Sequence, residues 1–263
     1  MRISGYDLRV GLWHGNPASV PLLIFNGIGS HLELLGPFVQ MLDPNRTVIV
    51  FDVPGTGESP APPLPYRLWM LARLTSQLLG LLGHERVHVM GVSWGGAIAQ
   101  QFAVQRSARC AKLILAATAT GMLMVPGNLL TLARMATPRR LTDRGYLRKH
   151  FGSLYGGAAR VEPALYEELG RFMHSANRVG YLFQQLALVG WSSLPFLPLV
   201  RQRTLILAGD DDPLVPLVNA RLMAALIPRS QVRVLEDGHL FLFSRGAESA
   251  AAVNSFLSDE HPG

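Results

Sequence analysis

The segment VHVMGVSWGGAIAQQFA, residues 87–103, constrains the fold of this chain more than any other stretch. An apolar run leads directly into Gly-x-Ser-x-Gly, with Ser93 at its centre, and a helical pattern follows. This order is typical of a strand that turns sharply into a helix. Gly91 and Gly95 have no side chains, so the turn can be tight and the helix can pack closely on the strand. The pattern predicts that Ser93 stands at the carboxyl end of a strand, where open α/β folds bind their ligands.

Short apolar runs bounded by Gly and Pro alternate with helical segments along most of the chain. This alternation predicts an α/β fold, with a mostly parallel sheet and helices on both of its faces. The expected strands are Val20–Phe25, Thr47–Phe51, Val87–Met90, Leu113–Ala117, Thr204–Ala208 and Gln231–Leu235, with Tyr6–Trp13 as an edge strand. The expected helices are Leu32–Leu42, Arg67–Leu82, Gly95–Arg106, Val218–Leu226 and Ala247–Leu257.

The alternation breaks between about residues 120 and 200. This stretch is rich in Leu, Met, Phe and Arg, has no clear strand, and predicts helices such as Pro163–Ser175 and Tyr181–Val189. We therefore expect a helical cap at 120–200, inserted into a core formed by residues 1–119 and 201–263. Only 16% of the residues are charged, so we also expect exposed apolar surface that suits a greasy substrate.

The net charge of +6 is concentrated in the expected cap, where basic residues outnumber acidic ones. No nucleic-acid-binding motif accompanies this charge, so a solvated helical face is the favoured interpretation and no nucleic-acid partner is expected. No apolar run reaches the roughly 18 residues of a membrane span, and the first residues lack the apolar core of a signal peptide. Cys110 is the only cysteine, which fits a reducing compartment. We expect a cytoplasmic protein, and the sequence predicts no particular oligomeric state.

A serine hydroxyl needs a base before it can act as a nucleophile. In enzymes built around such a turn, the serine, an acid and a histidine follow in that order along the chain. His239, in LEDGHLFLF directly after the last expected strand, is the one histidine in the right place. The acid lies among Asp210, Asp211 and Asp212, which follow the strand Thr204–Ala208. Asp212 is favoured over its two neighbours because it precedes a proline, which stiffens the loop.

Two further expectations concern the surroundings of Ser93. A negative oxygen that forms during acyl transfer is stabilised by two backbone N–H groups. One should come from Trp94, the residue after Ser93, and the other from Ile28 in the loop Asn-Gly-Ile-Gly that follows an early strand. The three aspartates lack the additional ligands that a metal site requires, so we expect neither a metal nor a cofactor.

Together these residues resemble the α/β-hydrolase superfamily over essentially the whole chain. Its acid pattern, Gly-x-x-Asp before x-x-Val-Pro, falls on Gly209, Asp212 and Val215–Pro216. The resemblance thus implies that Ser93 is the nucleophile, His239 the base and Asp212 the residue that orients the base. The usual His-Gly of the oxyanion loop is replaced here by Asn-Gly, which leaves the backbone donor in place.

A closer likeness is carried by PLLIFNGIG, FDVPG, GVSWGGAIAQQFA, LAATATGMLMVPG, LAGDDDPLVPL and DGHLFL. These segments are similar to the intracellular depolymerases of medium-chain-length polyhydroxyalkanoates. In the expected cap, LYGG and GYLFQQLALVGWSS are similar too. The likeness implies hydrolysis of 3-hydroxyalkanoate esters through an acyl-enzyme, at storage granules in a bacterial cytoplasm, with a hydrophobic polyester or acyl ester as the binding partner.

Three other functions fit the same residues. A general medium-chain carboxylesterase or lipase would use the same triad. A haloperoxidase or a hydrolase of C–C bonds would also use a serine triad. A non-catalytic binding protein on a hydrolase scaffold is the alternative from another class, and a missing triad residue would favour it, but every triad residue is present.

Overall fold

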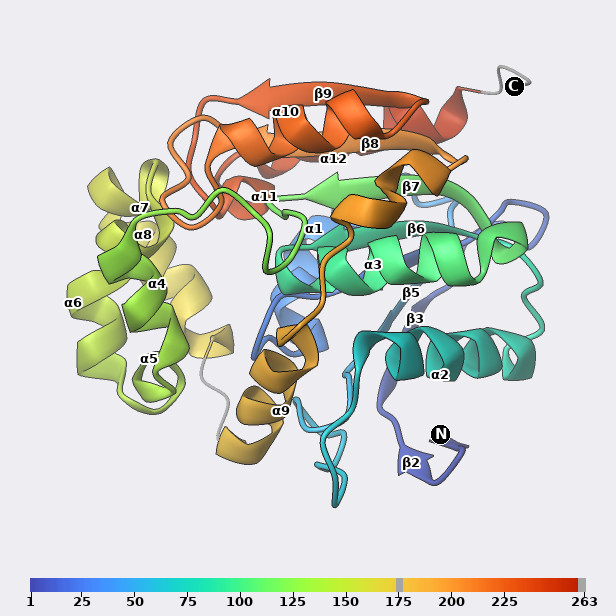
Figure 1. Ribbon diagram of the computed structural model, residues 1–263, viewed down its shortest axis with the longest axis horizontal. Coiled ribbons are helices and arrows are strands. Elements are labelled where there is room, and N and C mark those ends of the chain that lie inside the picture. Colours follow the sequence, from blue (N-terminus) through green and yellow to red (C-terminus); the bar gives the residue numbers. More distant parts are fainter. Residues whose placement is uncertain (174–176, 260–263) are drawn as a thin grey trace.

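A seven-stranded sheet forms the centre of the computed structural model, which describes residues 1–173 and 177–259 (Figure 1). The strand order is β3-β5-β4-β6-β7-β8-β9, and every neighbouring pair is parallel except β3 and β5. Its strands are β3 (Val10–Trp13), β4 (Leu22–Phe25), β5 (Val48–Phe51), β6 (Val87–Val92), β7 (Cys110–Ala116), β8 (Arg203–Gly209) and β9 (Ser230–Leu235). The expected α/β class and the mostly parallel sheet are confirmed.

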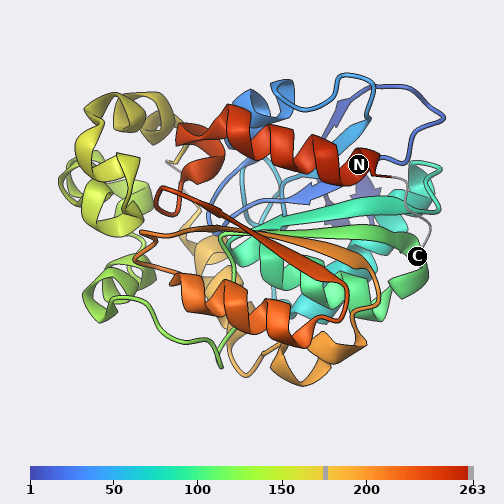
Figure 2. The ribbon, with the colours of Figure 1, turned by 90° about the horizontal axis from the view of Figure 1, so that it is seen from above.

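Helices cover both faces of the sheet (Figure 2). One hydrophobic cluster lies under α2 (Leu68–Leu81), α3 (Trp94–Gln105) and α10 (Leu217–Leu226). A second cluster lies on the other face, under α1 (Gly36–Gln40), α11 (Phe241–Ser244) and α12 (Gly246–Ser258). All residues of β4, β5 and β6 are buried, because helices cover both of their sides. This explains why these strands, apart from His88 in β6, are apolar throughout rather than alternating.

Two expected elements at the start of the chain are each split in two. The segment Tyr6–Trp13 does not form one strand: β2 (Tyr6–Asp7) pairs with β1 (Arg2–Ile3) in a small separate sheet, and only β3 joins the main sheet as its edge. The expected helix Leu32–Leu42 begins as a 3₁₀ helix at Leu32–Leu35 and continues as α1.

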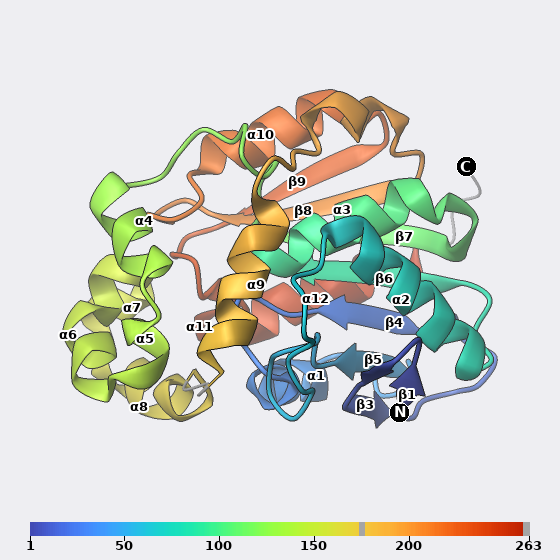
Figure 3. The same cartoon turned by 60° about the horizontal axis from the view of Figure 1, so that its bottom comes forward.

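The segment between β7 and β8 contains helices and one isolated β-bridge, between Gly121 and Ser192. Its helices are α4 (Leu129–Ala136), α5 (Arg139–Thr142), α6 (Arg144–Tyr155), α7 (Ala158–Val161), α8 (Pro163–Leu169) and α9 (Arg178–Leu188), with 3₁₀ turns at Gly170–Phe172 and Leu194–Leu199. Helices α4 to α8 lie beyond the carboxyl ends of the strands, whereas α9 crosses in front of the sheet (Figure 3). The expected helix Pro163–Ser175 ends at Leu169 and continues as the first of these turns, and its last two residues lie outside the described part. The division into a core and a cap at residues 120 and 200 remains a prediction.

No helix in residues 1–173 and 177–259 is both long and apolar enough to cross a membrane.

The basic residues between Gly121 and Val200 do not all share one environment. Arg144 and Arg148 are exposed, as a solvated face requires, but Arg140 is buried with only 3% of its surface exposed.

Candidate active site

Ser93 lies at the sharp turn between β6 and α3, as the glycine pattern predicts. Its backbone has φ +52° and ψ −119°, an unfavourable conformation for a residue with a side chain. The N–H of Ser93 donates to the carbonyl of Ala116 at 2.8 Å, which ties the turn to β7. A Cβ atom at Gly95 would lie 2.3 Å from the carbonyl oxygen of Phe25, so a glycine is required there for α3 to pack against the end of β4.

The structure brings Ser93, His239 and Asp212 into one series of hydrogen bonds. The Nε2 atom of His239 lies 2.9 Å from Oγ of Ser93, and its Nδ1 atom lies 2.6 Å from Oδ2 of Asp212. A carboxylate can only accept, so Nδ1 carries the proton of the neutral imidazole, and Nε2 accepts from the serine hydroxyl. The other oxygen of Asp212 accepts from the N–H groups of Leu214 and Val215, at 2.8 and 3.0 Å, and these bonds fix the carboxylate.

The two neighbours of Asp212 have different contacts. Oδ1 of Asp210 accepts from the N–H of Asp237 at 3.0 Å, which holds the loop that carries His239. Asp211 points to the segment between α6 and α7, where Oδ2 accepts from the N–H of Gly157 at 2.8 Å and pairs with Arg160. Of the three aspartates, only Asp212 reaches the imidazole.

Asp237 was not predicted to have a role near the site. Its buried carboxylate accepts from the N–H groups of Gly238 and Ala158, at 2.6 and 2.7 Å, and from the hydroxyl of Ser244. The N–H of His239 itself donates to the carbonyl of Tyr155 at 2.6 Å. The histidine loop is therefore bonded to the segment at α6 and α7, which lies some 80 residues earlier in the chain.

Ile28 and Trp94 are the residues whose backbone N–H groups are expected to stabilise the negative oxygen. Trp94 is the first residue of α3, so its N–H has no acceptor within the helix. The N–H of Ile28 has no acceptor among the described residues, whereas that of Gly27 donates to Oδ1 of Asn26 at 2.8 Å. The amide of Asn26 also donates to the carbonyl of His31 at 2.8 Å. Asn26 therefore shapes this loop through its side chain.

Residues of the segment between β7 and β8 form hydrogen bonds with the loop that contains Ile28 and with Trp94. Oε1 of Gln184 accepts from the N–H of Gly29 at 2.8 Å, and the carbonyl of Gln184 accepts from the indole N–H of Trp94 at 2.9 Å. The guanidinium of Arg140 donates to the carbonyl of Ile28 at 2.7 Å. Helices α5 and α9 thus contact both of the backbone segments that carry the expected donors.

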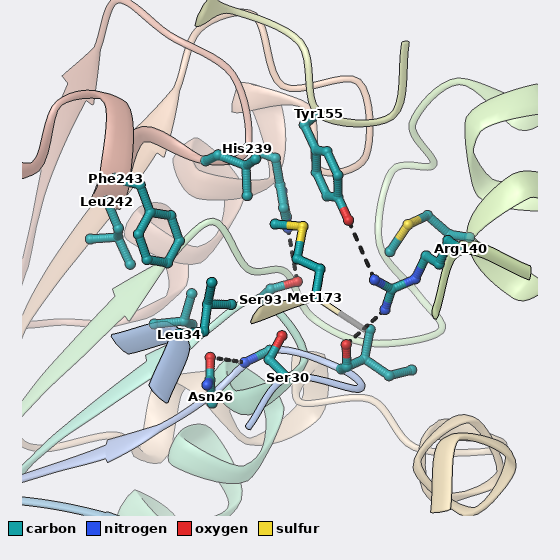
Figure 4. Close-up of a pocket in the computed structure, with 15 residues that line it drawn as sticks. Asn26, Ser30, Leu34, Ser93, Arg140, Tyr155, Met173, His239, Leu242 and Phe243 are labelled. Carbon is teal, nitrogen blue, oxygen red and sulfur yellow. Dashed lines mark hydrogen bonds between the residues drawn. The ribbon is translucent and has the colours of Figure 1, made fainter. Parts of the chain in front are cut away.

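Two cavities meet at Ser93 and share Ile28, Met135 and His239 in their walls. The first encloses about 510 Å³, part of it open to solvent, and contains both polar and apolar side chains (Figure 4). The second spans about 650 Å³, also partly open to solvent, and is lined mainly by apolar residues: Ile28, Trp94, Ala97, Ala119, Met124, Leu132, Met135, Leu188, Leu214 and Val215. The second cavity is thus mainly apolar, whereas the first also contains Arg140 and Tyr155.

No local sequence pattern distinguishes Arg140 or Tyr155 as site residues. Arg140 differs in no local pattern from its exposed neighbour Arg139, and Tyr155 ends a helix whose buried residues, Tyr155 included, pack in a hydrophobic cluster. In the structure the ring of Tyr155 stacks on that of His239, with 6.3 Å between the centroids. Burial raises the pKa of the Tyr155 phenol, so its hydroxyl keeps its proton. No cluster of three or more metal-binding side chains is present within the described residues.

Comparisons with known proteins agree with this architecture. The family model of the alpha/beta hydrolase fold matches residues 20–245. A poly(3-hydroxyalkanoate) depolymerase of Ectopseudomonas oleovorans is 46% identical over 260 residues, which cover 99% of this chain and 92% of that protein. The likeness to polyhydroxyalkanoate depolymerases predicted from the motifs is therefore confirmed.

Solved structures show the same fold. The enol-lactonase from Burkholderia xenovorans LB400 superposes with a TM-score of 0.85 at 21% identity, covering 98% of both chains. A thermophilic esterase from Thermogutta terrifontis gives a TM-score of 0.82 at 25% identity, covering 98% of this chain and 95% of that one. Because the family model matches residues 20–245, which is most of its length, this chain belongs to the α/β-hydrolase family.

Proposed function

We propose that this chain is a serine ester hydrolase that cleaves medium-chain-length poly(3-hydroxyalkanoate) through an acyl-enzyme. The hydrogen-bonded series Asp212–His239–Ser93 is the observation that carries the chemistry. The polyester substrate is supported by the relative named as a poly(3-hydroxyalkanoate) depolymerase, which is alignable over nearly the whole chain.

The geometry supports a two-step reaction. His239 takes the proton of Ser93 as Oγ attacks the ester carbonyl, and Asp212 stabilises the imidazolium that forms. The N–H groups of Ile28 and Trp94 stabilise the negative oxygen of the tetrahedral intermediate. His239 then gives its proton to the departing alcohol, and a water molecule cleaves the acyl-enzyme by the same route. No step requires a cofactor.

The apolar cavity suits an aliphatic chain. Its methionine and leucine side chains adapt to a flexible chain, and each methylene that they bury adds up to about 0.8 kcal/mol of favourable free energy. The same lining would accept any medium-chain acyl group, so a general medium-chain carboxylesterase is the second candidate function. Comparing an insoluble polyester with a soluble ester separates the two.

The outer face of α9 supports contact with a solid polyester. Val179, Leu182, Leu186 and Val189 follow one another at helical spacing and are 50%, 50%, 37% and 54% exposed. The buried face of α9 includes Gln184 and Tyr181 as well as Ala187, so the helix exposes aliphatic side chains while it buries two polar ones. Met122 and Leu123 are also exposed, and Met122 is joined to residues 190 and 191 by hydrogen bonds.

We name this exposed apolar surface, formed by Met122, Leu123, Val179, Leu182, Leu186 and Val189, the α9 surface. Exposed apolar patches mark sites that bind other apolar surfaces. The occupant that fits the proposed reaction is the aliphatic surface of a polyester granule, which would place the protein at storage granules in the cytoplasm.

Release of hydroxy acids tests the proposed function directly. A suspension of poly(3-hydroxyoctanoate) is incubated with the protein and with Ser93→Ala, and free 3-hydroxyoctanoate is quantified. The proposal requires release by the parent chain and a loss on the order of 10³-fold or more in the variant. Hydrolysis of p-nitrophenyl octanoate without any release from the polymer would favour the general carboxylesterase instead.

A further inference from the structure

Arg140 is a buried cation that has no anionic partner in the described part of the chain. Only 3% of its surface is exposed, and no described carboxylate lies within 4.0 Å of its guanidinium. Its acceptors are neutral: the hydroxyls of Tyr181 and Tyr155, at 3.2 and 3.3 Å, and the carbonyl of Ile28 at 2.7 Å. An arginine stays charged in a protein, and a buried charge without a counter-ion is costly.

The unused donors of this cluster belong to residues that line the first cavity. A guanidinium has five N–H donors, and three of those of Arg140 are used within the described structure. The hydroxyl oxygen of Tyr155 accepts from Arg140, and its proton has no acceptor among the described residues. Figure 4 shows Arg140 and Tyr155 together in the cavity that also contains Ser93 and His239.

A carboxylate is the ligand that fits these groups. It supplies the missing negative charge, and its two oxygens match the planar fork of a guanidinium. Leu34, Met173, Leu242 and Phe243 are among the apolar residues that line the same cavity, so the anion should carry an aliphatic chain. Since the same cavity contains the nucleophile, this anion belongs to the reacting molecule.

We propose that Arg140 and Tyr155 form a binding site for the terminal carboxylate of a 3-hydroxyalkanoate chain, so that the enzyme removes units from the carboxyl end. This inference rests on the proposed polyester hydrolysis and specifies which end of the polymer the enzyme cleaves. Arg140 contacts the substrate away from the bond that breaks, so the site determines which ester bond is cleaved and takes no part in breaking it.

The reaction then proceeds with a defined leaving group. Oγ of Ser93 attacks the carbonyl of the penultimate unit, and the bond from that carbonyl carbon to the ester oxygen breaks. His239 gives the serine proton to this oxygen, so the last unit leaves as a 3-hydroxyalkanoate whose carboxylate lies at Arg140. Water cleaves the acyl-enzyme and creates a new terminal carboxylate on the shortened chain, which the same site can bind in the next cycle.

Binding of a simple acid tests the site without turnover. Ser93→Ala protein is titrated by calorimetry with octanoate and with octanamide, which has nearly the same shape but no charge. We expect octanoate to bind at least about tenfold more tightly. This preference should disappear when Arg140→Met is added and persist when Arg139→Met is added, because Arg139 is exposed on the same short helix. Equal binding of acid and amide to the Ser93→Ala protein would overturn the inference without reference to any arginine variant.

Turnover supplies a second, independent readout. The dimer 3-hydroxyoctanoyl-3-hydroxyoctanoate is compared with its methyl ester, and the free acid should have a kcat/KM at least about tenfold higher. Equal rates for the two dimers would overturn the carboxylate site while leaving the proposed ester hydrolysis intact. Failure to cleave either dimer or the polymer, with octanoate still preferred over octanamide, would instead refute the proposed function and leave Arg140 as an anion site.

Discussion

The imidazole of His239 lies 2.6 Å from the carboxylate of Asp212, although 27 positions separate the two residues in the chain. The loop after β8 carries the aspartate, and the loop after β9 carries the histidine. Because β8 and β9 are parallel neighbours, both loops emerge at the same edge of the sheet. The bonds from Leu214 and Val215 leave Asp212 one free oxygen, and that oxygen faces His239.

Removing the charge of Asp212 should therefore abolish most activity. In Asp212→Asn the amide oxygen can still accept from the loop backbone, but the NH₂ group would face Nδ1 and favour the wrong tautomer of His239. We expect kcat to fall by about 10³- to 10⁴-fold with the fold intact.

Asp210→Asn is the matched control, because its contact with the N–H of Asp237 needs only an oxygen acceptor. It should cost less than about tenfold. Steady-state kinetics on p-nitrophenyl octanoate make the comparison, and equal losses in the two variants would mean that the loop acts only as a structural unit.

The apolar cavity predicts a preference for long acyl chains. Six methylenes separate an octanoyl ester from an acetyl ester, and each is worth up to roughly fourfold in kcat/KM if its burial is realised in the transition state. After losses to chain ordering, kcat/KM should still rise by at least about tenfold across a series of p-nitrophenyl esters. Faster cleavage of the acetyl ester would show that the cavity does not take up the acyl chain.

The α9 surface predicts binding to polymer particles. Leu182→Glu places a charge in the middle of this surface and should weaken sedimentation with poly(3-hydroxyoctanoate) particles several-fold, while hydrolysis of a soluble ester stays near the parent value. Ala251→Glu, at an exposed position on α12, introduces the same charge elsewhere and should sediment like the parent chain. If both variants sediment equally with the particles, the α9 surface is not the contact.

His88 predicts a loss of stability in mild acid. Burial, together with Arg46, Lys112 and Arg86, lowers the pKa of His88 from 6.5 to about 3. Between these values the unfolded chain binds a proton that the folded chain does not, so stability is lost as the pH falls below about 6.5. The contribution approaches about 1.4 kcal/mol per pH unit.

Urea unfolding at pH 7, 6 and 5 measures this effect. The parent chain should lose more stability over this range than His88→Gln, which has no imidazole to titrate. Parallel losses in the two proteins would show that other groups cause the pH dependence.

The sequence predicted the parts of the structure that depend on local physics. Apolar runs predicted the buried strands. The glycines on either side of Ser93 predicted a sharp turn, since a Cβ at Gly91 or Gly95 would collide with neighbouring atoms. Pro213 stiffens its loop and so favours Asp212 as the acid, and the structure places Asp212, not Asp210 or Asp211, against His239.

Other features depend on contacts between distant segments, which no local pattern contains. Arg140 and Arg139 are adjacent and chemically identical, yet only the packing of α5 over the Ile28 loop buries one and exposes the other. Asp237 joins Ala158 across 79 positions of sequence. The aliphatic outer face of α9 is likewise not apparent from the sequence, because leucines at helical spacing, such as Leu182 and Leu186, are as typical of a buried helix face.

Covalent labelling of Ser93 tests the central claim most directly. A fluorophosphonate reacts with a serine that its base has activated, so incubation followed by peptide mass spectrometry should find a single adduct on the peptide that contains Ser93. Ser93→Ala should carry no adduct under the same conditions, and Asp212→Asn should label far more slowly. An adduct that persists in Ser93→Ala, or a parent chain that does not react, would contradict the account.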